Sequence, residues 1–460
     1  MPLNNNNNQE KAIFSGNLNK KQPIIALKDV LTSNKSLSTI NQLFEEKTNI
    51  VSFFSSKQEI KNFINFLVYK SINKISQEKA PGNREFGDIQ TPLPLVRKVY
   101  QYLLKEDFKP ELLIEPTFGI GNFIFPALDF FPSIKIIYGV ELQQKNKWTL
   151  GLRSWLENWE KKQVQHSAKP KIYLHKDNIF THEFLIEEFE SPSSVLIIGN
   201  PPWVTAAELT SLGSKNIPKK SNFKALRGLN ALTGKSNFDI SESVLQLLLQ
   251  QFSHKKGKIA LLLKNTVIRN LLKHLPNTDY TISQLKALEI NASREFGIAC
   301  DASLFVGDLG VTTNDLVCEI RSLDKPKRII KKVGWFKNNF VADVNQYQQC
   351  VSLEGKSKLI WRQGVKHDCA KVMELQLLEN GLLKNRLHEK IDLERGLLYP
   401  LLKGADIGPF EICESQKRII LTQKRLNEET AKIKSLYPKT WEYLQTKRAF
   451  FAKRKSKIYN

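Results

Sequence analysis

Four consecutive residues, Asn200-Pro201-Pro202-Trp203, combine hydrogen-bond acceptors with an aromatic ring. They directly follow the apolar run VLIIG, and two prolines after a strand force the chain into a rigid, extended exit. Neither proline has an amide donor, so backbone carbonyls remain as acceptors beside the side-chain oxygen of Asn200. Acceptors next to an aromatic plane suit a flat ring that carries an amino group. The alternative is an ordinary rigid loop.

A glycine-rich turn, EPTFGIGNF, follows another apolar run and begins with Glu115. Gly119 and Gly121 let the backbone turn sharply and approach a ligand closely, and a following helix can aim its N-terminal amides at that ligand. Tight packing is the other use of such a glycine pair. Because Ile124 occupies the third glycine position of the dinucleotide fingerprint, the turn argues against a nicotinamide enzyme.

Two acidic residues end further apolar runs. Glu141 lies about 20 residues past the glycines, the usual place for an acid that accepts both ribose hydroxyls of a nucleoside. Asp177 can accept a hydrogen bond from an adenine amino group, with Ile179 or Phe180 covering the ring. The alternatives are a surface glutamate and a helix N-cap aspartate.

These segments alternate with helical ones, which predicts βαβ units and a mostly parallel, Rossmann-like α/β sheet. In such a sheet, ligands bind at the carboxyl ends of the strands, where all of these residues fall. Residues 37–80 are predicted to be helical and amphipathic. Beyond about residue 310 the pattern is less regular, and the basic segment IRSLDKPKRIIKKVGWF is compatible with strands. We therefore expect an N-terminal arm and helical segment, a catalytic domain and a basic C-terminal domain over residues 1–80, 81–310 and 311–460.

Charge points to a polyanionic partner, because the 460 residues carry a formal net charge of +23. A charge that serves only solubility is the alternative. The stretch from residue 209 to 238 has no acidic residue and suits phosphate contact, unless it is simply a solvated loop. Its candidate contacts are Lys215, Lys219, Lys220, Lys224 and Arg227.

Other function classes find no support in the sequence. The five cysteines are scattered and the seven histidines form no cluster, which predicts no metal site and reduced thiols. The asparagine-rich N-terminus lacks the apolar core of a secretory signal, and no run of 18 apolar residues is present. We expect a cytoplasmic protein without a membrane partner.

Taken together, the motifs resemble those of the amino-methyltransferases that modify adenine N6 in DNA, in the gamma-type order with the cofactor region before the catalytic N-P-P-Y/F/W motif. Glu115 stands where those enzymes usually have Asp. The resemblance extends to FGDIQTP, whose Thr91 matches a segment closing over the cofactor, and it makes Phe296 a second base-stacking aromatic, unless that ring belongs to the core. It implies S-adenosylmethionine as cofactor, held by Thr91, Glu115, Gly119, Gly121, Glu141, Asp177 and Ile179.

The same resemblance implies methyl transfer to adenine N6 in duplex DNA after base flipping, as the modification component of a restriction-modification system. The C-terminal domain would read the target sequence. No nuclease signature precedes residue 80, which argues against a bifunctional restriction enzyme and leaves open a separate restriction endonuclease as partner. The motif also permits methylation of RNA. Methylation of protein glutamine is a further alternative, but the basic C-terminal region argues against it. The last alternative is a catalytically silent DNA-binding module.

Overall fold

The computed structural model divides the chain into two compact units, Met1–Glu354 and Gly355–Asn460. Each unit is described by itself, and each has its own hydrophobic core. The described residues are 21–72, 89–160, 170–185, 192–205, 239–360, 364–365, 367–406, 415–425 and 428–454.

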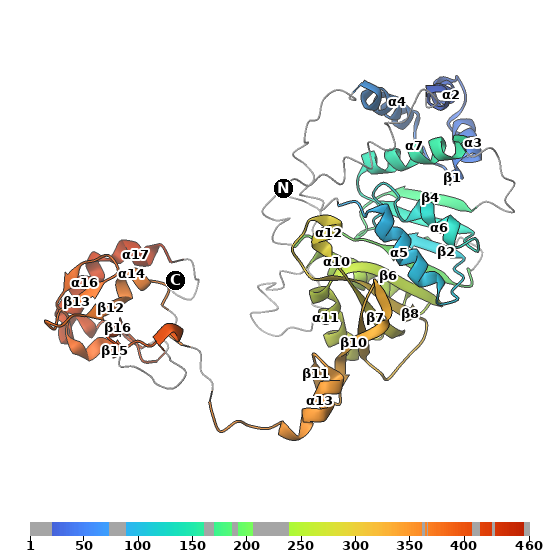
Figure 1. Ribbon diagram of the computed structural model, residues 1–460. Coiled ribbons are helices and arrows are strands. Elements are labelled where there is room, and N and C mark those ends of the chain that lie inside the picture. The colour runs from blue at the N-terminus through green and yellow to red at the C-terminus, as the bar shows by residue number, and fades with distance from the viewer. Residues whose placement is uncertain are drawn as a thin grey trace. The chain divides into compact units, whose positions relative to one another are not determined.

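One mixed sheet organises the first unit (Figure 1). Among the described residues its strand order is β1-β4-β3-β2-β5-β6-β8-β7-β9-β10-β11. Neighbouring strands from β1 to β6 pair in parallel, and β8 is antiparallel to both of its neighbours. The strands are β1 (Ile50–Val51), β2 (Leu112–Glu115), β3 (Ile136–Glu141), β4 (Lys171–Lys176), β5 (Val195–Gly199), β6 (Gly257–Lys264), β7 (Ile282–Ile290), β8 (Ala302–Leu309), β9 (Val317–Ser322), β10 (Lys325–Phe336) and β11 (Asn339–Val341).

The predicted α/β sheet is confirmed, and the four apolar runs described above form β2, β3, β4 and β5. Side chains alternate between the two faces of a strand. In β2, Leu113 joins one core cluster, whereas Leu112 and Ile114 join the cluster on the opposite face. Because helices cover both faces, β2, β3, β5 and β6 are almost continuously apolar, whereas the two ends of β4 are exposed.

Helices cover the two faces of this sheet in separate groups. One group contributes to the core cluster that contains Leu113 and consists of α2 (Lys21–Thr32), α3 (Leu37–Thr48), α4 (Lys57–Ile72), α5 (Leu93–Leu104), α6 (Ile124–Phe130) and α7 (Gln144–Glu160). The opposite face is covered by α10 (Ile240–Phe252) and α11 (Asn265–His274). Shorter helices are α12 (Ala292–Phe296) and α13 (Val344–Cys350). No described helix is long and apolar enough to cross a membrane.

The N-terminal segment is built into this unit. The expected helical stretch of residues 37–80 is interrupted after α3, where Asn49 adopts a left-handed conformation, and β1 follows and pairs with β4. Phe44 of α3 stacks on Phe53, with ring centroids 4.6 Å apart, and also lies against Trp155 of α7 at 5.8 Å. The first helices therefore share an aromatic core with the helix that follows β3.

The structure divides the chain differently from the sequence expectation of boundaries near residues 80 and 310. Strand β9 pairs with β7 in parallel, and β10 and β11 extend the same sheet. A local sequence pattern identifies a strand but does not show which sheet it joins. Residues 311–354 thus belong structurally to the first unit.

The second unit contains a small antiparallel sheet, in the order β14-β13-β12-β16-β15 among its described residues. Its core includes Leu375, Ile420 and Tyr443, and the buried Glu374 carboxylate binds Arg386 and Lys403. The elements are α14 (Ala370–Met373), β12 (Glu374–Leu377), β13 (Leu383–Asn385), β14 (Lys390–Ile391), β15 (Leu398–Pro400), β16 (Lys417–Ile420), α15 (Ile433–Leu436), α16 (Pro438–Thr446) and α17 (Arg448–Ala452).

Candidate active site

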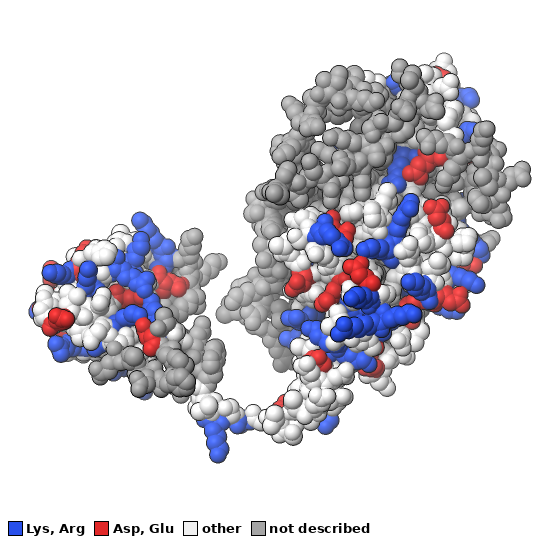
Figure 2. All heavy atoms as spheres, viewed as in Figure 1, with Lys and Arg blue, Asp and Glu red and all other residues white. Residues whose placement is uncertain are grey.

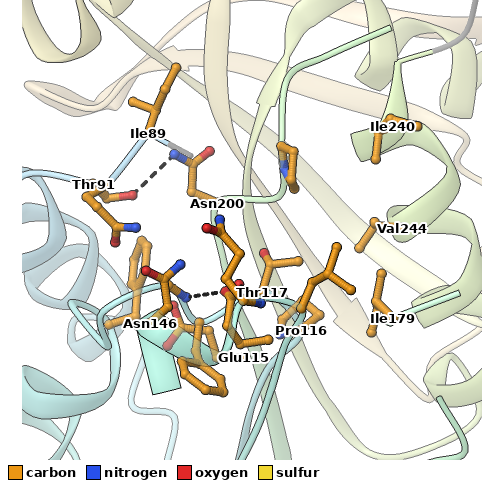
Figure 3. A pocket seen from close by; sticks show the side chains of 18 of the residues that line it. Ile89, Thr91, Glu115, Pro116, Thr117, Asn146, Ile179, Asn200, Ile240 and Val244 are labelled. Atoms are coloured by element: carbon orange, nitrogen blue, oxygen red, sulfur yellow. Dashed lines mark hydrogen bonds between the residues drawn. The ribbon is translucent and has the colours of Figure 1, made fainter. Parts of the chain in front are cut away.

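A pocket lies where β2, β3, β4 and β5 end at the carboxyl edge of the sheet (Figure 3). The segment before α5 and the first turns of α10 complete its lining. The topology brings together side chains more than 100 residues apart in sequence, as the sequence analysis predicted. The predicted residues that line the pocket are Thr91, Glu115, Gly119, Glu141, Asp177, Ile179, Asn200 and Pro202.

Asn200 follows β5 directly, and its two side-chain atoms have different surroundings. Its Nδ2 donates a hydrogen bond of 3.2 Å to Oγ1 of Thr91, as Figure 3 shows. Within the described part of the chain, its Oδ1 is buried and has no hydrogen-bond partner. A buried acceptor without a donor is costly, so its persistence suggests a ligand donor. Thr91 therefore orients the amide so that its oxygen is left for a ligand.

Trp203 lies at the end of the same segment and is fixed by three contacts. Its ring nitrogen donates to the backbone oxygen of Leu262 at 3.1 Å, and Lys264 donates to its carbonyl at 2.9 Å. Phe296 of α12 meets its ring edge to face, with centroids 5.2 Å apart. The structure thus brings together the two aromatic residues that the sequence analysis assigned to base stacking. Phe296 itself is buried.

The glycine turn holds Glu141 in the pocket. The Gly119 amide donates to one carboxylate oxygen at 2.9 Å, and the Gln143 amide donates to the other at 2.8 Å. Gly119 has φ +52°, and a Cβ there would lie 2.5 Å from Oε1 of Gln90. At Gly121 a Cβ would instead strike Leu150 at 2.6 Å. One glycine therefore serves the pocket, and the other permits close packing against α7.

Glu115 is a second acid in the pocket, but its surroundings differ from those of Glu141. Its side chain is only 2% exposed, and within the described residues its Oε2 has no hydrogen-bond partner. Burial, together with the nearby charge of Glu141, holds the pKa of Glu115 well above its ordinary value. Two neighbouring acids thus differ in character, since amides stabilise the ionised form of Glu141 and burial favours the neutral form of Glu115.

Asp177 lies at the end of β4 and is held by two donors. The amide of Asn178 donates to Oδ1 at 2.7 Å, and His182 Nδ1 lies 2.8 Å from Oδ2. Burial acts to raise the pKa of Asp177, but these hydrogen bonds outweigh it and the pKa is lowered. Ile179 lines the adjoining wall with Ile240 and Val244 of α10 (Figure 3). An anionic acceptor therefore stands beside an apolar wall.

A comparison with known proteins shows the family to which the chain belongs. The chain is 34% identical over 376 residues to the type II methyltransferase M.NspV from Nostoc sp.. The aligned region covers 82% of this chain and 76% of that protein. It belongs to the type II methyltransferase family. No protein-family model matches the chain.

Solved structures resemble this methyltransferase more distantly. The methyltransferase subunit of a type I restriction-modification system from Streptococcus thermophilus is 14% identical, with a TM-score of 0.34, over 71% of this chain and 72% of that one. The type IIG restriction endonuclease BpuSI is 13% identical, with a TM-score of 0.36, over 94% of this chain but only 57% of its own length.

Several pocket residues of this methyltransferase escaped the sequence analysis. Gln90 accepts a hydrogen bond from the Ile120 amide at 3.1 Å. In the sequence, only its position next to Thr91 indicates that Gln90 lies at the site. Thr117 lies inside the glycine turn, and its buried hydroxyl has no partner among the described residues. Ile240 and Val244 have the spacing of one helix face, which does not distinguish a pocket wall from a core.

Other predicted residues of the methyltransferase fall outside the described residues. These are the candidate phosphate contacts Lys215, Lys219, Lys220, Lys224 and Arg227. Their role stays a prediction. Within the described residues, no group of histidine, cysteine and acidic side chains is arranged to hold a metal ion.

Proposed function

We propose that this methyltransferase transfers a methyl group from S-adenosylmethionine to N6 of an adenine flipped out of duplex DNA, as the modification component of a restriction-modification system. The observation that carries the proposal is the buried Oδ1 of Asn200, which lacks a partner among the described residues and whose amide is oriented by Thr91. An exocyclic amino group is the ligand that such an acceptor fits.

The pocket residues suit the proposed cofactor. Glu141, with both oxygens fixed by amides, would accept from the ribose hydroxyls, and Asp177 would accept from the adenine amino group. Ile179 and Val244 would cover the ring. Buried polar atoms of Glu115 and Thr117 that lack partners in the described residues add to this fit. When bound, the cofactor would supply an electrophilic methyl group on a sulfonium sulfur.

The chain's own contribution to the reaction would be orientation and charge stabilisation. The adenine amino lone pair is delocalised into the ring, so the nitrogen is a poor nucleophile. Asn200 and the Pro201 carbonyl would accept from its two hydrogens and stabilise the positive charge that develops on nitrogen. The remaining rate enhancement would come from positioning, because the site would hold the amino group in line with the methyl group.

A flipped base also requires a surface to stack on. Unstacking costs a few kcal/mol, and aromatic stacking returns roughly 1–3 kcal/mol per base. Trp203 is the stacking residue in this proposal, and its edge-to-face contact with Phe296 stiffens it.

Charge favours a nucleic-acid substrate. Figure 2 shows Lys and Arg side chains gathered where β10 lies in Figure 1. Lys325, Lys327 and Arg328 of this strand are exposed. Together with the net charge of +23, this surface supports binding to phosphates.

Labelled S-adenosylmethionine, offered with duplex DNA or with RNA, tests the substrate, and nucleoside analysis of the product tests the position. We expect N6-methyladenine in DNA. Label in RNA alone, or on cytosine, would contradict the proposal.

Substitution of Asn200 tests the catalytic assignment. Asn200→Ala should lower transfer by about 10²–10³ while the affinity for the cofactor stays nearly constant. Thr91→Val removes the hydroxyl that orients Asn200 and should cause a smaller loss of transfer. Thr91→Ser keeps the hydroxyl and serves as its matched control. Unchanged turnover in Asn200→Ala would refute the assignment.

A further inference from the structure

Behind Asp177 lies a cluster of aromatic and imidazole rings that the proposed chemistry does not use. Tyr138 of β3 stacks on His175 of β4, with ring centroids 4.5 Å apart, and His182 lies 5.1 Å from His175. Phe184 closes the cluster against His182 at 5.0 Å. His182 is 8% exposed, so its ring is held by packing.

Hydrogen bonds connect this cluster to Asp177 in the pocket through His182. His182 Nδ1 lies 2.8 Å from Asp177 Oδ2, and Nε2 lies 2.8 Å from the hydroxyl of Tyr138. An ionised carboxylate offers only lone pairs, so Nδ1 of His182 must be the donor to Asp177. In a neutral imidazole, Nε2 is then an acceptor, and the hydroxyl of Tyr138 donates to it. With that tautomer, the order of donation is Tyr138 to His182 to Asp177.

This relay restrains a side chain that would otherwise be free to turn. The side chain of Asp177 is 46% exposed to the pocket, whereas that of His182 is 6% exposed. With Oδ2 held by His182 and Oδ1 by the Asn178 amide, the carboxylate has a fixed plane. Its remaining lone pairs form an acceptor of defined direction.

We infer that His182 and Tyr138 are positioning residues that make Asp177 a fixed acceptor, so that the pocket selects a 6-amino purine over a 6-oxo purine in the cofactor. The inference rests on the proposed use of S-adenosylmethionine. A 6-oxo purine places a carbonyl oxygen where the amino group would donate, and two acceptors facing each other repel. A carboxylate free to rotate could move toward the ring N1–H of the 6-oxo purine, and the discrimination would fall.

A pair of amide substitutions separates positioning from packing. In His182→Asn, the side-chain nitrogen takes the place of Nδ1, so the bond to Asp177 is kept. His182→Gln places its amide at the position of Nε2 instead and loses that bond. His175→Asn is the matched control, since His175 contacts the same Tyr138 ring, and the described residues give it no hydrogen bond to Asp177.

The measurement is calorimetric binding of S-adenosylhomocysteine and its 6-oxo counterpart, S-inosylhomocysteine, to the full chain. We expect the wild type, His182→Asn and His175→Asn to keep a similar preference for the 6-amino compound. In His182→Gln the preference should fall about tenfold, as for loss of one hydrogen bond to a charged group. Tyr138→Phe should produce a smaller fall, because the ring remains and only the outer donor is lost.

The outcomes distinguish this inference from the proposed function. If the wild type binds neither compound, the proposed cofactor is wrong. If the wild type discriminates and His182→Gln discriminates equally, the positioning role alone is refuted. Equal losses of preference in His182→Asn and His182→Gln would also refute it, because they would assign His182 to packing.

Discussion

The raised pKa of Glu115 has a consequence for stability that depends on pH. Burial, and next the charge of Glu141, raise the pKa of Glu115 well above 4.5 in the folded chain. Between pH 4.5 and the folded pKa, the folded chain holds a proton that the unfolded chain has released. The contribution of protonated Glu115 to the free energy of unfolding is fully present below pH 4.5 and is lost as the pH rises toward the pKa of Glu115 in the folded chain.

The size of the effect follows from proton linkage. A difference of one bound proton changes the free energy of unfolding by about 1.4 kcal/mol per pH unit. Glu115→Gln keeps the shape of the neutral carboxyl but does not titrate. The variant should therefore gain stability relative to the wild type by about 1.4 kcal/mol for each pH unit within this window.

Urea unfolding at three pH values above 4.5 measures this difference. Both proteins carry the same second unit, so its contribution cancels in the comparison. The exposed Glu289 provides a control, and Glu289→Gln should follow the wild-type slope. A stability difference between Glu115→Gln and the wild type that stays constant with pH would show that Glu115 is ionised in the fold and refute the reasoning.

Two further predictions concern the backbone and the buried charges. Gly119→Ala places a Cβ 2.5 Å from Gln90 at a residue with a left-handed φ. It should lower the stability and the cofactor affinity more than the control Gly381→Ala, where φ is +79° and no described atom lies within 4 Å of the added Cβ. Equal losses of stability in the two variants would contradict a role for the contact with Gln90. Glu59 and Lys147 form an ion pair of 3.4 Å with side chains 10% and 7% exposed, so Glu59→Ala should cost about 3–5 kcal/mol in urea unfolding. Adding Lys147→Met should recover part of that loss, and no recovery would argue against an uncompensated buried lysine.

The sequence predicted the central sheet and much of the pocket for physical reasons. Strands β2, β3, β5 and β6 are buried on both faces, so they appear as nearly continuous apolar runs. Parallel strands end at one edge, and residues that directly follow them, such as Glu141 and Asn200, must gather there. A position directly after a predicted strand therefore indicated that a residue lies at the site.

Contacts between distant segments were not predictable in this way. Strand β1 has two residues and lies between helical segments, so only its pairing with β4 defines it. The relay through His182 depends on Tyr138, which is 44 residues away in sequence. The assignment of β9 and β10 to the first unit likewise required knowledge that β9 pairs with β7 and that β10 pairs with β9. Such features depend on tertiary contacts that no local pattern contains.

The pairing of Ile50 in β1 with Ile172 in β4 also affects how the chain is made. A ribosome synthesises the first strand about 120 residues before its partner, an interval of roughly 6 to 24 s at about 5–20 residues per second. During most of that interval, the stacked pair of Phe44 and Phe53 lacks Trp155, the ring that stacks on Phe44 in the finished fold. Nascent chains halted before residue 155 should therefore expose this aromatic cluster and bind chaperones, and chains that include β4 should bury it.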